Sequence, residues 1–91
     1  MGDIPFTQYL RPNGRAKEVS IDRPSEISDL AQRIIDAGFR FECEELTTGH
    51  ASLTIAGPEG DEDIELVMNG PGVPDAVDNL VRRFAEKIGI S

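Results

Sequence analysis

The sequence predicts an α+β fold: a five-stranded, mainly antiparallel sheet with two helices on one face, in the order ββαβββα. Two observations predict it, namely two apolar stripes at helical spacing and three segments in which apolar and polar residues alternate. Two amphipathic helices can cover one face of such a sheet and leave the other open, which makes a two-layer architecture. Residues 1–91 are enough for one core of this kind, so we expect a single domain.

The N-terminal segment, residues 4–21, predicts a hairpin. Asn13-Gly14 is the strongest short turn signal in the chain, because both residues tolerate positive φ. Pro12 cannot donate a hydrogen bond to a sheet ladder, so it closes the first strand. Val19 and Ile21 alternate with polar neighbours at the period of a strand, and we expect them in the second strand.

The first helix is predicted in the segment "RPSEISDLAQRIIDAG", residues 23–38. Its apolar residues follow the spacing i, i+3, i+4, i+7, i+8, which places them on one continuous stripe: Ile27, Leu30, Ala31, Ile34 and Ile35. Pro24 suits the start of the helix, where a missing N–H does no harm. Gly38 suits a left-handed end.

The second predicted helix closes the chain. Its stripe consists of Val77, Leu80, Val81, Phe84, Ala85 and Ile88. Pro74 and Asp75 suit the first turn, and Gly89 ends the helix. If both stripes pack on the same face of the sheet, the central residues should be nearly fully buried: Leu30, Ile34, Leu80 and Phe84.

Three strands are predicted between the helices. Their apolar faces consist of Phe39, Phe41 and Cys43, then Ala51, Leu53 and Ile55, then Ile64, Leu66 and Met68. Turns are expected at residues 47–49 and 57–60. One apolar face and one polar face are typical of an antiparallel sheet that is covered on one side only. The open face should then show Glu42, Glu44, Ser52, Thr54, Glu65, Val67 and, from the first strand, Tyr9.

The net charge of -8 comes from the middle of the chain. Residues 41–81 contain no Lys or Arg and carry ten carboxylates, whereas residues 1–40 are balanced. Such a surface repels nucleic acid and anionic membranes and attracts basic protein surfaces. We therefore expect no direct nucleic-acid binding and no membrane binding.

Candidate catalytic residues are few. Cys43 is the only thiol, and its phase with Phe41 places it in the core, where a thiol is unreactive. His50 is the only imidazole, so a zinc site built from His and Cys is excluded. We expect no catalytic residue, no metal and no cofactor, and therefore a protein that is not an enzyme.

Two spacings begin like ligand-binding loops and then depart from them. The run Asp61–Glu65 has the one-three-five spacing of an EF-hand, but Leu66 stands where that loop needs Gly, and Gly72 where it needs Glu. The segment Gly70–Gly72 precedes a helix like a phosphate loop, but Pro71 and Pro74 remove backbone N–H donors that a phosphate needs. The run Asp61–Glu65 is better explained as a turn followed by the outer face of a strand, and Gly70–Gly72 as a connection that leads into a helix.

The chain also predicts a compartment. No apolar run is long enough to cross a membrane, and the N-terminus lacks the basic and apolar regions of a secretory signal. A single cysteine cannot form an internal disulfide. A cytoplasmic protein is the expectation.

Four segments resemble a family of small uncharacterised bacterial proteins that are associated with phage and mobile-element genes: "IPFTQYLRPNGR", "IDRPSEI", "FECEELTTGHASLTI" and "NGPGVPDAVDNLVRRF". The resemblance spans residues 4–84. It implies a context and no activity, so it assigns no functional residue. Small acidic proteins in that context often occupy a basic surface of a host or phage nucleic-acid-binding protein, as DNA mimics and anti-CRISPR inhibitors do.

The leading hypothesis is a non-enzymatic protein-binding module. Its contact residues would be Glu42, Glu44, Asp61, Asp63 and Glu65, and its partner a protein with a basic surface. The first alternative is a structural or assembly subunit that forms homo-oligomers through the open sheet face. The second is a small-ligand-binding domain with loops around His50 and Gly70. We expect a monomer or a weak homodimer. The acidic face could equally serve solubility alone.

Overall fold

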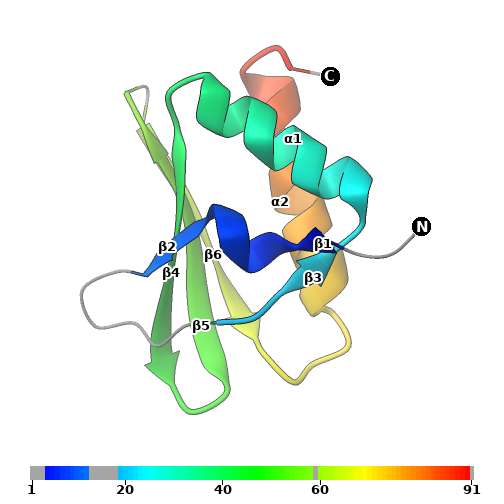
Figure 1. Ribbon diagram of the computed structural model, residues 1–91. Helices are drawn as coiled ribbons and strands as arrows, with labels where there is room; N and C mark the ends of the chain where they lie inside the picture. The colour runs from blue at the N-terminus through cyan, green and yellow to red at the C-terminus, as the bar shows by residue number, and fades with distance from the viewer. Residues whose placement is uncertain (1–3, 13–18, 59, 91) are drawn as a thin grey trace.

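The computed structural model describes residues 4–12, 19–58 and 60–90. Two helices lie on one side of a four-stranded sheet, and a two-stranded sheet lies beside them (Figure 1). The α+β class is confirmed. The elements are β1 Ile4–Pro5, the 3-10 turn η1 Phe6–Tyr9, β2 Leu10–Pro12, β3 Asp22–Arg23, α1 Ser25–Asp36, β4 Arg40–Thr47, β5 His50–Gly57, β6 Gly60–Val67 and α2 Val73–Lys87.

The larger sheet has the strand order β2-β4-β5-β6. Strands β4, β5 and β6 form an antiparallel meander, and β2 adds to β4 in parallel. Gly49 and Gly60 have φ values of 82° and 124° at the two turns of the meander, a conformation that favours glycine. The three predicted central strands are therefore confirmed, each extended to eight residues.

The predicted five-stranded sheet is wrong in its N-terminal part. Strand β1 pairs with β3 in a separate sheet, where Ile4 is opposite Arg23, and β2 joins the main sheet instead of pairing with the segment after it. The Asn13-Gly14 turn lies outside the described residues. Val19 and Ile21 lie outside the strands.

Phe6 explains this division of the N-terminal segment. Its ring is fully buried and meets Phe41 edge-on, with 5.5 Å between ring centroids. The chain turns through η1 at this point, and the Phe6 N–H donates to the Ile21 carbonyl at 2.6 Å. Burial of this aromatic side chain interrupts what the sequence pattern presented as one strand.

Both helical stripes pack into the same core as the sheet. Ile34, Leu80 and Phe84 are buried as predicted, with Leu80 and Phe84 each 3% exposed. Leu30 is only partly buried, so the prediction for this residue is wrong. It packs against the core and also lines a groove between α1 and α2.

An ion pair joins the small sheet to the second helix. Arg23 on β3 donates from Nε and Nη2 to the two carboxylate oxygens of Asp78 on α2, at 2.8 and 2.6 Å. The two side chains are 11% and 25% exposed. This two-point contact fixes β3 against α2, because a guanidinium matches a carboxylate in one plane.

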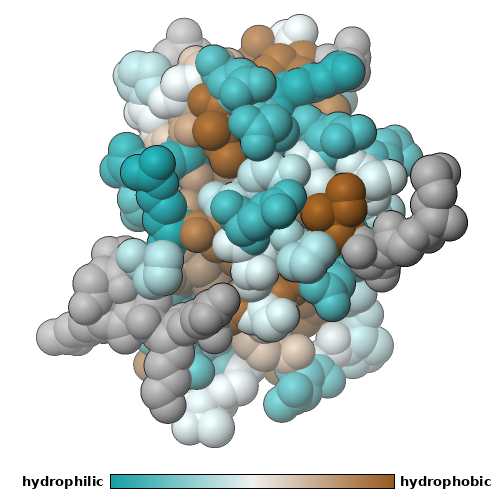
Figure 2. Space-filling view, viewed as in Figure 1, coloured by the Kyte–Doolittle hydropathy of each residue, from teal (hydrophilic) through white to brown (hydrophobic). Residues whose placement is uncertain are grey.

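In the described part of the chain, neither helix combines the length and the apolar composition that crossing a membrane requires. The view in Figure 2 shows mostly hydrophilic residues, with apolar residues in small separate patches.

Candidate functional site

The sheet register brings the predicted carboxylates onto one face. Across β4, β5 and β6, Glu42 is opposite Thr54, which is opposite Asp63. In the next row of the sheet, Glu44, Ser52 and Glu65 follow one another. A third row consists of Arg40, Ala56 and Asp61. We call Glu42, Glu44, Asp61, Asp63 and Glu65 the acidic face.

The other side of the same strands is the core side. Cys43, Leu53 and Ile64 form a row there, and the first two are buried. Because side chains alternate along a strand, the acidic face lies on the side that the helices leave open (Figure 1). Adjacent strands lie about 4.8 Å apart, so the backbones of Glu42 and Asp63 are about 10 Å apart. The expected gathering of these residues on one face is therefore found.

Exposure differs between the two sides of the acidic face. Glu42 and Glu44 on β4 are half-buried, whereas Asp61, Asp63 and Glu65 on β6 are exposed. Strand β4 has neighbours on both sides, and β6 is at the edge of the sheet. The carboxylates on β6 are consequently the more accessible ones.

Basic side chains neutralise the β4 side of the face in part. Arg40 donates a hydrogen bond from Nε to the carboxylate of Glu42. This bond, with the charges of Glu42 and Asp61, raises the pKa of Arg40. Arg11 on β2 is the register partner of Glu42. Negative charge is therefore concentrated toward β6 and the Glu44 row.

Arg40 adjoins the acidic face, and the pattern of carboxylates does not point to it. Arg40 and Glu42 are two residues apart, and residues at this spacing lie on the same face of a strand. That signal was present in the sequence. The position of Arg11 was not, because it depends on the parallel pairing of β2 with β4.

One residue expected on the open face, Tyr9, has a different position. Tyr9 is in η1, 5.8 Å from Phe6 between ring centroids, and packs against the core rather than on the open face. Glu62 is on the helix side of β6, where Arg83 of α2 approaches it at 3.7 Å. Val67 is 54% exposed at the end of the open face, as expected.

The residues considered for catalysis are arranged as structural residues. Cys43 is 3% exposed, and burial raises the pKa of its thiol. His50 on β5 is opposite Val67 on β6, and it does not line either of the two hollows beside Gly70. Within residues 4–12, 19–58 and 60–90, no group of three or more His, Cys, Asp or Glu side chains is arranged to hold a metal ion.

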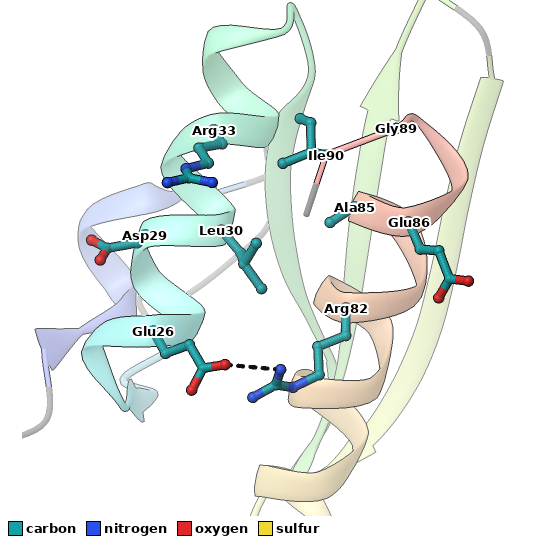
Figure 3. A pocket seen from close by; sticks show the side chains of 9 residues that line it. All are labelled: Glu26, Asp29, Leu30, Arg33, Arg82, Ala85, Glu86, Gly89 and Ile90. Carbon is teal, nitrogen blue, oxygen red and sulfur yellow. Dashed lines mark ion pairs between the residues drawn. The ribbon is translucent and has the colours of Figure 1, made fainter.

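A groove of about 720 Å³ lies between α1 and α2 (Figure 3). Leu30, Ala85 and Ile90 form its apolar part. Arg82 and Glu26 form an ion pair of 3.0 Å across it, and both side chains are at least half exposed. Catalysis needs charged groups that are oriented in a shielded site, and these charged groups are in contact with solvent.

Comparisons with known proteins add no relative. No protein-family model, no curated protein and no solved structure matches this chain. The resemblance to small phage-associated bacterial proteins stays a prediction.

Proposed function

We propose that this chain is a non-enzymatic protein-binding module whose acidic face binds a basic surface of another protein. The observation that supports it best is the row of exposed carboxylates on β6, continued by Glu44 across the sheet. The resemblance to phage-associated proteins suggests a nucleic-acid-binding protein of host or phage as the partner. Binding would then inhibit that protein, in the manner of a DNA mimic or an anti-CRISPR protein.

The spacing of the carboxylates favours electrostatic steering. Charges on this face are within about 10 Å of their neighbours, which is close to the Debye length at about 0.1 M salt. An approaching basic surface therefore meets their summed potential, and this raises the association rate more than the final affinity. Hydrogen-bonded strands hold the backbone of the face in place, so its display needs little ordering on binding.

Self-association through the open face is the weaker alternative. Two copies facing each other would bring the carboxylates of Asp61, Asp63 and Glu65 together, and like charges oppose such contacts. The same repulsion keeps a protein soluble, so solubility alone is the competing explanation for the acidic face.

The test begins with capture of partners from the native host at low salt, followed by purification of one identified partner. Association rates are then measured over a range of salt concentrations. Reversal of Glu44, Asp63 and Glu65 to Lys should slow association sharply and abolish its salt dependence.

The matched control reverses three exposed carboxylates on the helices, Asp29, Asp36 and Glu86. It changes the net charge equally and leaves the acidic face intact. If both triple variants bind the partner at the same rate, net charge alone matters and the acidic face is not the contact surface.

A further inference from the structure

Strand β6 is a long free edge of the sheet. It has eight residues, and among the described residues it pairs with β5 alone. A free edge presents N–H and C=O groups that can pair with another extended chain. Natural proteins often protect such edges, so the chemistry around the edge decides what can dock there.

The register shows which backbone groups face outward. The Met68 N–H donates to the Gly49 carbonyl at 2.7 Å, which continues the pairing of β6 with β5. Hydrogen-bonded and non-hydrogen-bonded pairs alternate in an antiparallel ladder, so the even-numbered residues of β6 bond to β5. The backbone groups of Asp61, Asp63, Glu65 and Val67 therefore point away from β5.

The same odd-numbered residues carry the exposed carboxylates. Asp61, Asp63 and Glu65 flank the edge on the open face. On the helix side, a hollow of about 350 Å³ lies between the end of β6 and the start of α2. Its apolar lining includes Leu66, Val73 and Ala76. The edge thus has acidic chemistry on the open face. On the helix side it has the apolar hollow near Leu66 and the ion pair of Glu62 with Arg83 nearer the start of the strand.

We propose that the β6 edge binds an extended segment of the partner as an additional strand, with basic residues at alternate positions and apolar residues between them. This inference rests on the proposed function and specifies its partner. Side chains alternate along the added strand, so Lys or Arg would face the carboxylates, and an intervening apolar residue beside Leu66 would face the hollow. Opposite charges across neighbouring strands stabilise a pair.

A second copy of this chain does not fit the edge. Antiparallel pairing of β6 with itself about Asp63 would place Asp63 opposite Asp63 and Asp61 opposite Glu65. Like charges directly opposite each other destabilise a strand pair. Pairing at this edge is therefore unfavourable with a second copy of the chain and favourable with a basic partner.

The probe is a short blocked peptide of alternating lysine and valine, added to the full-length chain at low salt. The comparison peptides are one of the same composition with its lysines contiguous, and one N-methylated on the amides that would pair. We expect the alternating peptide to bind about tenfold or more tightly than either comparison peptide, since an unmade hydrogen bond leaves a group unsatisfied. In amide exchange by NMR, Asp61, Asp63 and Glu65 should exchange fast in the free protein and slow down on binding.

Asp63→Pro and Asp63→Ala separate the backbone from the charge. Both remove the carboxylate, and only proline removes the outward N–H, which β5 does not use. The proline variant should bind the alternating peptide about tenfold more weakly than the alanine variant. Unchanged amide protection of Ile64 and Leu66 would confirm that the proline variant is folded. The N-methylated peptide tests the same hydrogen bonds without any change in the protein.

The outcomes distinguish this inference from the proposed function. If all three peptides bind equally, with salt dependence and sensitivity to reversal of Glu44 and Glu65, the acidic face binds basic chains and the edge does not. If no peptide binds at low salt, the edge does not bind extended basic chains and this inference is wrong, while the proposed function is decided by the association rates of the identified partner. If reversal of Asp29, Asp36 and Glu86 weakens binding equally, both proposals are wrong.

Discussion

Replacement of Gly57 by alanine should destabilise the protein although glycine is usually the less stable residue in a strand. Gly57 is the last residue of β5, and the ring of Phe39 lies against it. A Cβ atom at this position would overlap with Cδ2 of Phe39 and lie 2.8 Å from its Cγ. Phe39 is 7% exposed and meets Phe84 edge-on, with 5.0 Å between ring centroids, so a shift of the ring disturbs a packed contact.

The size of the effect follows from three contributions. Insertion of a methyl group into a packed core costs about 1–3 kcal/mol. Displacement of Phe39 also weakens its contact with Phe84, and an aromatic pair of this kind contributes about 0.5–1.5 kcal/mol. Alanine has less conformational entropy than glycine in the unfolded chain, and this stabilises the folded state by about 0.4–1 kcal/mol. We expect a net loss of about 1–3 kcal/mol, and each kcal/mol lowers Tm by about 4–8 °C in a domain of this size.

Urea unfolding followed by circular dichroism measures this loss. Gly72→Ala is the control for an added methyl group, because no heavy atom lies within 4 Å of its Cβ position; Gly72 is the N-cap residue of α2, where alanine is less favoured, so this change should cost at most about 1 kcal/mol. In a Phe39→Ala background the Gly57→Ala change should be nearly neutral, since the Cγ, Cδ2 and Cε2 atoms that cause the overlap are gone. Equal losses with and without the Phe39 ring would refute this reasoning.

Three further predictions concern the core and the ion pair. Leu80→Ala should lower the free energy of unfolding by about 2–5 kcal/mol, because Leu80 is buried. Leu30→Ala should lower it by only about 1 kcal/mol, because Leu30 is partly exposed. Equal losses in urea unfolding would contradict the observed packing. Arg23 and Asp78 should show a coupling of about 1–3 kcal/mol in a double-mutant cycle, since their hydrogen bonds are charged and partly shielded; a coupling near zero would mean that the contact does not hold β3 on α2. Cys43 should react slowly with iodoacetamide in the native protein and rapidly in denaturant, because the buried thiol is shielded. Since burial raises the pKa of the thiol, the labelling rate of the native protein should rise at a higher pH than the rate in denaturant. Because the pKa of Cys43 is raised in the folded state, the contribution of its thiol to the free energy of unfolding is fully present below the unfolded pKa and is lost as pH rises through the folded pKa. Equal labelling rates in native protein and in denaturant would show that the thiol is in contact with solvent.

The acidic face shows how far the sequence alone leads. Alternation predicted that Glu42, Glu44 and Glu65 share a face, because side chains in a strand have a period of two. It could not predict that Arg11 lies beside Glu42, since that depends on a parallel pair between distant segments. The shift of negative charge toward β6 follows from this pairing and from the hydrogen bond between Arg40 and Glu42.

The sequence by itself determined the α+β class, both helices, the three long strands and the inward position of Cys43. These features depend on local periodicity, and a residue's neighbours in the chain decide which face it occupies. Only the tertiary structure decided that β1 and β2 belong to different sheets, that Leu30 lines a groove, and that β6 is the free edge. The pairing of strands depends on which side chains, distant in sequence, fill the core together, as Phe6 does against Phe41. Local sequence patterns do not specify these contacts.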